Sequence, residues 1–217
     1  MKPRLSDFVA FVYIATITAL LFIELQQFIT ITKAHPFVMG FAKFALLATF
    51  GECLKNRFGF NAKWIPNNMP IKAFVWGLFG IWITWAFTYA DAGFRGLISV
   101  GLWPDATLFA SGFWMNLFNA FSKSLWINLL SGYAFFMMFF HLYLDTMING
   151  KCLGWPWELF GCGKEGMKWG KVVFLSLIFF WIPAHTITFM LPPEFRVIFA
   201  AYLSIALGGI LTFASGR

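Results

Sequence analysis

Apolar residues fill six long runs of this chain, separated by shorter stretches rich in charge, glycine or proline. A helix of about 20 residues crosses the roughly 30 Å hydrocarbon core of a bilayer. The last two runs, which form a hairpin around Pro192, have almost no polar face, unlike helices of water-soluble proteins. The predicted transmembrane helices are Phe8–Ile31, Phe37–Arg57, Ile71–Tyr89, Leu125–Thr146, Lys171–Met190 and Phe195–Ala214. We therefore predict an all-α polytopic membrane protein, a bundle of about six transmembrane helices forming one domain over residues 1–217.

Composition supports a membrane protein. Hydrophobic residues make up 60% of the chain and charged residues 12%, about half the charged fraction of an ordinary globular domain. The first apolar run follows Lys2 and Arg4, as in a signal peptide, but it is longer than a signal peptide's apolar region. We expect this run to be kept as the first transmembrane helix.

The distribution of basic residues predicts the topology. With the N-terminus in the cytoplasm, the inner segments hold eleven of the 16 Lys and Arg residues and the outer segments hold four. The positive-inside rule then places both termini on the cytoplasmic side, or on the equivalent side of an organellar inner membrane. The net charge of +7 is thus a signal of topology and of anionic lipid, and membrane lipids rather than nucleic acid are the expected partners.

Two connections are longer than a membrane crossing requires. The outer one, residues 92–124, places aromatic and aliphatic residues from Phe109 to Phe121 at helical spacing, which predicts a helix lying flat at the interface. The inner one, residues 149–170, contains Trp155, Trp157 and Trp169 and is expected to anchor the chain at headgroup level.

Ionisable residues within apolar runs are costly, so they are the first candidates for function. Glu24 and Lys43 lie at the same depth on either side of the first hairpin, about 9–10 Å below one surface. We expect them to meet, either as a structural ion pair between helices or as part of the lining of an aqueous passage.

A second polar group is predicted at the inner ends of the helices. Glu52 and Asn56 lie near the end of the second run, and His141 and Asp145 are one helical turn apart on the fourth. His141 with Asp145 is either a proton-sensitive pair or a helix-terminal hydrogen bond. Both interpretations stay open at this stage.

His185 follows Pro183 by two residues inside the fifth run. A proline frees a carbonyl one turn earlier, here that of Phe179, and His185, Thr186 and Thr188 are placed to bond the kinked backbone. Contact with a solute is the alternative. No metal or cofactor is predicted, because the three histidines fall at different depths, and no catalytic motif indicates an enzyme.

The last helix carries a stripe of small residues at intervals of four. Such a stripe allows close approach to a neighbouring helix, in the same chain or in a second copy. The helix-packing residues predicted are Ala200, Ser204, Gly208 and Thr212.

Several short elements resemble a known family. The C-terminal pattern is Trp181, Pro183, Phe189, Pro192, Arg196, Leu203 and Ser204; an earlier element combines Gly51, Glu52 and Asn56; and a central one contains Ser124, Leu125, Asn128, His141 and Asp145. Together they resemble the Mpv-seventeen and peroxisomal membrane protein group of small integral membrane proteins. That resemblance implies a weakly selective channel in which Glu52, Asn56, Pro183 and Arg196 matter.

The sequence therefore favours a channel or facilitator for small hydrophilic solutes. The candidate lining or gate residues are Glu24, Lys43, Glu52, Asn56, His141, Asp145, His185 and Arg196. The alternative is an accessory subunit packed against a larger membrane complex, which suits the small-residue stripe and the lack of any catalytic motif.

Overall fold

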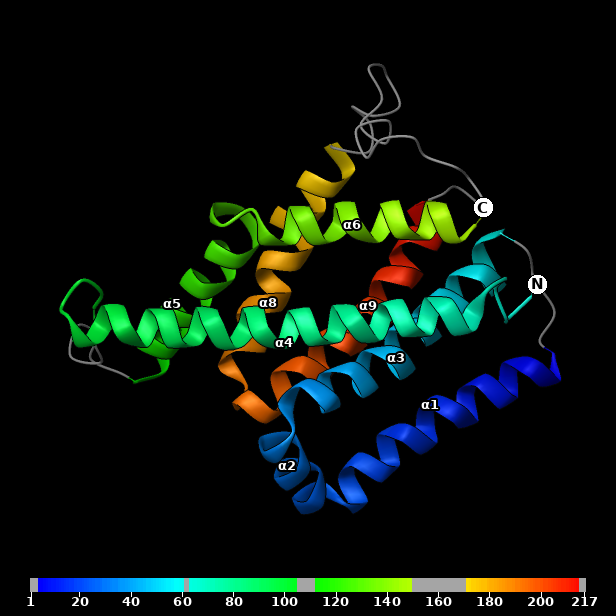
Figure 1. Ribbon diagram of the computed structural model, residues 1–217, viewed down its shortest axis with the longest axis horizontal. Coiled ribbons are helices and arrows are strands. Elements are labelled where there is room, and N and C mark those ends of the chain that lie inside the picture. Colours follow the sequence, from blue (N-terminus) through cyan, green and yellow to red (C-terminus); the bar gives the residue numbers. More distant parts are fainter. Residues whose placement is uncertain (1–3, 61–62, 105–111, 150–170, 215–217) are drawn as a thin grey trace.

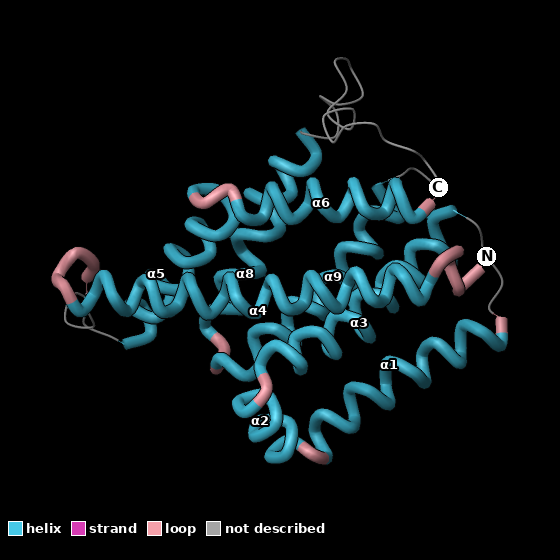
Figure 2. The backbone as a smooth tube through the Cα atoms, in the orientation of Figure 1, coloured by secondary structure: helices cyan, strands magenta, loops and turns pink. Residues whose placement is uncertain are grey.

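The computed structural model describes residues 4–60, 63–104, 112–149 and 171–214, and within these ranges all side chains except those of residues 59, 60 and 207–214. This part of the chain forms helices joined by short turns and contains no strand (Figures 1 and 2). The all-α prediction is confirmed. The interface anchors predicted at Trp155, Trp157 and Trp169 lie outside the described residues.

The helices follow the predicted apolar runs closely over residues 36–55, 171–190 and 193–214. The structure has helix over Lys171–Met190, as predicted, and its last part is a π-helical turn η4 followed by α8. The elements are α1 Leu5–Ile23, α2 Leu25–Ala34, α3 Pro36–Lys55, η1 Asn56–Phe60, α4 Met69–Ser99, α5 Gly112–Leu125, η2 Trp126–Leu130, α6 Tyr133–Ile148, η4 Leu177–Trp181, α8 Ile182–Met190 and α9 Pro193–Ala214.

The described residues contain four helices long and apolar enough to cross a membrane, namely α1, α3 with the start of η1, α4 and Lys171–Met190. A fifth is present if the bent pair Gly112–Leu130 and Tyr133–Ile148 counts as one span. The predicted sixth span falls on α9, whose side chains are described only as far as Ala206. Several apolar helices of this length are consistent with an integral membrane protein.

Helix α3 packs against both α4 and α9. Glycines allow this close packing. A Cβ atom placed on Gly51 would lie 2.9 Å from the carbonyl oxygen of Ser204 on α9, and Ala200 and Ser204 are buried there. The described part of the small-residue stripe thus packs within the chain. For Gly208 and Thr212 only the helical backbone is described, so their predicted packing lies outside the described part of the structure.

The first predicted span is broken. The helix stops at Glu24, whose backbone leaves helical geometry, and resumes as α2. Polar residues Glu24, Gln26 and Gln27 are exposed at this break, and α2 turns so that Phe28 and Thr32 are buried. Helix α1 diverges from the rest of the bundle (Figure 1) and contains no buried residue.

Helix α4 is longer than predicted, because it continues from Tyr89 to Ser99. It ends where Gly101 adopts a positive φ of 74°, and the amide of Leu102 then reaches back to the carbonyl of Leu97. This is the usual glycine-dependent end of a helix. The extension places Asp91, at the edge of the predicted loop, within a helix.

The segment predicted to form an interfacial helix is helical and packs against the bundle. Helix α5 contacts α8, with Met115, Ala120 and Ser124 buried. A 51° bend separates this segment from α6, at Gly132, whose φ is 70°. Residues predicted to form one straight span, Leu125–Thr146, therefore form parts of two helices.

Candidate functional site

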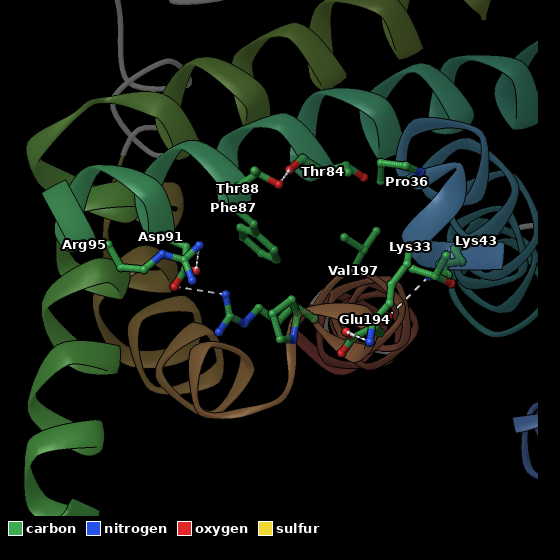
Figure 3. A pocket seen from close by; sticks show the side chains of 13 residues that line it. Lys33, Pro36, Lys43, Thr84, Phe87, Thr88, Asp91, Arg95, Glu194 and Val197 are labelled. Carbon is green, nitrogen blue, oxygen red and sulfur yellow. Dashed lines mark hydrogen bonds and ion pairs between the residues drawn. The ribbon is translucent and has the colours of Figure 1, made fainter. Parts of the chain in front are cut away.

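One face of α4 carries polar side chains near its C-terminal end. Thr84, Thr88, Asp91 and Arg95 recur at intervals of three or four residues, so they lie along one side of the helix. They line a cavity of about 190 Å³, which we call the Asp91 pocket (Figure 3). Its other lining residues are Thr32, Lys33, Pro36, Lys43, Phe87, Pro193, Glu194, Arg196 and Val197.

Asp91 is buried and is surrounded by cations from three helices. Its carboxylate lies 2.5 Å from Nζ of Lys123 on α5, 2.7 Å from the guanidinium of Arg95, and 3.2 Å from the guanidinium of Arg196 on α9. A buried carboxylate is stable only with such partners. This cluster therefore fixes the relative positions of α4, α5 and α9 at one end of the bundle.

Arg196 also holds the turn between α8 and α9. Its Nε donates to the carbonyl of Leu191 at 3.0 Å and its Nη2 to the carbonyl of Phe189 at 3.4 Å. Its guanidinium carbon lies 5.6 Å from the centre of the Phe189 ring. These contacts direct the guanidinium toward Asp91, so Arg196, one of the predicted site residues, lies in the wall of the pocket.

The predicted ion pair between Glu24 and Lys43 is wrong. Glu24 is exposed at the break between α1 and α2. Lys43 is buried, with 5% of its surface exposed, and its Nζ donates to Thr32 Oγ1 at 3.1 Å and to the carbonyl of Glu194 at 3.4 Å. The bend at Glu24 explains the difference, because α2 brings Thr32 rather than Glu24 to the level of Lys43.

A second polar pocket, of about 340 Å³, lies at the opposite end of α4; we call it the Lys72 pocket. Nζ of Lys72 forms an ion pair with Asp145 on α6 and lies 3.9 Å from Glu52 on α3. Glu52 also lies 3.5 Å from Lys55. The lining residues are Glu52, Lys55, Asn56, Pro66, Asn67, Lys72, Asp145 and Asn149.

The predicted inner group is thus brought together, with different partners. His141 Nε2 lies 3.7 Å from Glu52 Oε1, whereas Asp145 pairs with Lys72. His141 and Asp145 lie one turn apart on α6, and each contacts a charged residue of another helix. Asn56 lines the pocket and donates to the carbonyl of Lys63 at 3.0 Å.

His185 lies between the two pockets and is buried. The Nδ2 atom of Asn128 donates to the carbonyl of Ser124 at 2.8 Å and lies 3.0 Å from His185 Nδ1. Because a carbonyl only accepts, the amide nitrogen is the donor here, and Nδ1 of His185 accepts. Ser124 Oγ in turn donates to the carbonyl of Ile182 at 2.7 Å. His185 therefore couples α8 to η2 and, through Asn128, to the end of α5.

Pro183 is accommodated by widening the helix. The amide of Ile182 bonds the carbonyl of Leu177, five residues earlier, in the π-helical turn η4. Thr186 donates to the carbonyl of Ile182 at 2.7 Å and Thr188 to that of Ala184 at 2.9 Å. The threonines thus bond the backbone near the proline, as predicted, although not at Phe179.

A small cavity of about 40 Å³ lies beside His185. It has mostly apolar walls, and Phe87 lines both this central cavity and the Asp91 pocket. On its other side the ring of Trp76 lies 4.4 Å from that of His141, measured between centroids. The lining residues are Phe44, Trp76, Ile83, Phe87, Ile127, Tyr133, Ala134, Met137, Met138, Trp181, His185, Ala200 and Ser204.

The residues described here include no group of three or more His, Cys, Asp or Glu side chains placed to hold a metal ion. Comparisons of the chain with known protein families, curated proteins and solved structures give no match. The resemblance to the Mpv-seventeen group therefore stays a prediction.

Sequence reasoning missed several charged residues that organise the bundle, among them Asp7, Lys72 and Asp91. Asp7 accepts from Arg57 Nε at 2.8 Å and from Trp64 Nε1 at 2.7 Å, which attaches the start of α1 to η1 and to the connection that follows it. Two of them carried a signal. Asp7 is the first acidic residue of the chain, at the start of an apolar run, and Asp91 has Arg95 one helical turn later.

Proposed function

We propose that this protein is a channel or facilitator for small hydrophilic solutes across a membrane. The observation that carries the proposal is the position of the two polar pockets. Lys72 and Asp91 are 19 residues apart on α4, which is about 28 Å along a helix. That distance is close to the thickness of the hydrocarbon core, about 30 Å. A polar vestibule at each membrane surface is the arrangement expected of a transport protein.

The central cavity supports a connection between the vestibules. Phe87 separates it from the Asp91 pocket, since its side chain lines both. Trp76 lies on the other side, against His141 and hence next to Glu52 of the Lys72 pocket. A solute passing along α4 therefore requires movement of two aromatic side chains. We infer that Phe87 and Trp76 act as gates and that this conformation is closed.

The resemblance found in the sequence supports the same proposal. Glu52 and Asn56, which belong to the shared elements, line the Lys72 pocket, and Arg196 lines the Asp91 pocket. Pro183 lies beside the π-helical turn near the central cavity. The Mpv-seventeen group thus stays the family to which we propose the chain is related.

Flux measurements on purified protein in liposomes test the proposal. We expect the wild type to admit small hydrophilic solutes, and Phe87→Ala to raise the rate by removing a gate. Phe94→Ala is the matched control, because Phe94 is also buried on α4 but lines neither the Asp91 pocket nor the central cavity. Absence of flux for both the wild type and Phe87→Ala, over a range of solutes and voltages, would reject the proposal.

We further propose that both termini face the cytoplasm, or the equivalent side of an organellar inner membrane. The excess of Lys and Arg in the connections near the Lys72 pocket supports this orientation. Single cysteines placed at Ser6 and at Ser215, on either side of the predicted spans, in a cysteine-free variant would be labelled in intact cells only if they faced outward. Protection of both, with labelling after permeabilisation, is the expected result.

One observation favours the alternative of an accessory subunit. Helix α1 has no buried residue, so most of its surface is available to lipid or to another membrane protein. Purification in mild detergent separates the alternatives: constant co-purification with the same membrane proteins favours the subunit, whereas a single protein or homo-oligomer that transports solutes favours the facilitator.

A further inference from the structure

The Asp91 pocket carries more positive than negative charge. Four of its lining residues are cationic, Lys33, Lys43, Arg95 and Arg196, and two are acidic, Asp91 and Glu194. The Lys72 pocket is balanced, with two lysines and two carboxylates. The two ends of the bundle therefore differ in charge.

Lys43 is the clearest source of the excess. Its ammonium is buried and bonds only neutral oxygens, those of Thr32 and the Glu194 backbone, and its Nζ lies 4.4 Å from the centre of the Phe28 ring. Among the described residues no carboxylate lies within 4 Å of it. The side chain of Glu194 pairs instead with Lys33, at 3.1 Å. A buried ammonium without a carboxylate in direct contact is costly, and a bound anion would offset that cost.

Arg196 contributes further positive charge on the same wall. Asp91 carries one negative charge but faces three cations, Lys123, Arg95 and Arg196, so it cannot neutralise them all. The other partners of Arg196 are two backbone carbonyls. In addition α9 begins at Pro193 in the wall of the pocket, and the N-terminus of a helix favours negative charge.

We propose that the Asp91 pocket binds a small oxyanion, a phosphate or carboxylate group, with Lys43 as its cationic ligand and Arg196 as a further source of positive charge in the wall. Figure 3 shows Lys43 and Asp91 on opposite sides of the pocket with Phe87 between them. The volume of about 190 Å³ suits a small ion better than a drug-sized molecule. Anion binding itself does not depend on the proposed function. The inference rests on that function only where it makes the anion the class of solute that is transported.

Binding is measured without transport. The thermal unfolding midpoint of the protein in uncharged detergent is followed against inorganic phosphate, with sodium chloride at equal ionic strength as reference. We expect phosphate to raise the wild-type midpoint to a plateau, as a ligand of the folded state does. Lys43→Met and Lys43→Gln should lose this rise. Lys72→Met, which removes a buried lysine of the other pocket, should keep it.

Two variants at Lys43 keep the test decisive if one of them does not fold. An equal phosphate-dependent rise in the wild type and in the folded Lys43 variant overturns the proposal. So does a wild-type rise no larger in phosphate than in chloride. Solute flux without a phosphate effect on the midpoint would support the facilitator and overturn the anion site. A phosphate effect without flux would support the anion site and overturn the facilitator.

The anion could come from solution or from a lipid headgroup, and nanodiscs distinguish the two sources. For a solute site, phosphate raises the midpoint equally in phosphatidylglycerol and in digalactosyl diacylglycerol, which carries no phosphate. For a headgroup site, phosphatidylglycerol itself raises the wild-type midpoint, Lys43→Met does not respond, and added phosphate has no further effect. If neither anion distinguishes the wild type from Lys43→Met, the site does not exist.

Discussion

Gly80 on α4 lies directly against Gly40 on α3, so that a Cβ atom on Gly80 would be 2.2 Å from the Gly40 carbonyl oxygen. A Cβ on Gly40 would likewise lie 2.8 Å from the carbonyl oxygen of Gly80. Backbone atoms cannot move aside as a flexible side chain can. The contact between these helices therefore depends on the absence of both Cβ atoms.

Gly80→Ala should destabilise the protein by about 2 kcal/mol, because the added methyl group forces α3 and α4 apart. Gly96→Ala on the same helix is the control, since a Cβ there meets nothing within 4 Å and alanine favours helix. Reversible unfolding in detergent measures both. Equal stability of the two variants would show that the close approach is not needed.

Lys72→Met should lower the free energy of unfolding by about 2 kcal/mol, since it removes the charged partner of Asp145. Lys55→Met, whose loss affects a partly exposed pair within one helix, should cost less than about 1 kcal/mol. A double-mutant cycle of Lys72→Met with Asp145→Leu measures the coupling. If the effects of the two substitutions are additive, the ion pair between Lys72 and Asp145 does not contribute to stability.

Ser124→Ala should lower the free energy of unfolding by about 1 kcal/mol, because it removes the hydroxyl that donates to the carbonyl of Ile182 in the core. Ser122→Ala, two residues earlier, removes only a bond to the carbonyl of Phe118 in its own helix and should have little effect. Chemical denaturation of the two variants makes the comparison. A larger loss for Ser122→Ala would mean that the contact between α5 and α8 is unimportant.

Asp7→Ala should release the start of α1, because Asp7 is the carboxylate that accepts from Arg57 and Trp64. We expect a fall of several degrees in the thermal midpoint, smaller in the double variant Asp7→Ala with Arg57→Met, which also removes the buried guanidinium. Protease sensitivity near residue 24 should rise in parallel. An unchanged midpoint for Asp7→Ala would show that α1 is held by its other contacts.

The helical class, and the ranges of α3, Lys171–Met190 and α9, could be predicted because each depends on a local run of apolar residues. The break at Glu24 could not be predicted. Three polar residues lower the mean hydropathy of the run only slightly, and no proline or glycine marks the end of the helix. The extension of α4 beyond Tyr89 was missed for a related reason. Asp91 looks like the beginning of a loop until its partners on α5 and α9 are known.

Which candidate residues matter for the fold could be predicted, but the partner that each one contacts could not. Lys43 was singled out as an ionisable group at membrane depth, and Glu52 and His141 as polar groups at the inner ends of the helices. Each does contact another helix. Their partners are set by helix rotation and by the bends at Glu24 and Gly132, which no spacing rule contains. The partners of Asp91 on α5 and α9 lie 32 and 105 residues further along the chain.

The divergence of α1 leaves a wedge of about 270 Å³ between it and α9, lined by apolar side chains apart from Thr18 and Tyr202. These two hydroxyls form a hydrogen bond with each other at 2.7 Å, so they do not need water as a partner. An acyl chain is the group that suits such an apolar wedge in a bilayer. We therefore propose that lipid completes the packing of this protein, and we expect harsh delipidation to act on α1 first.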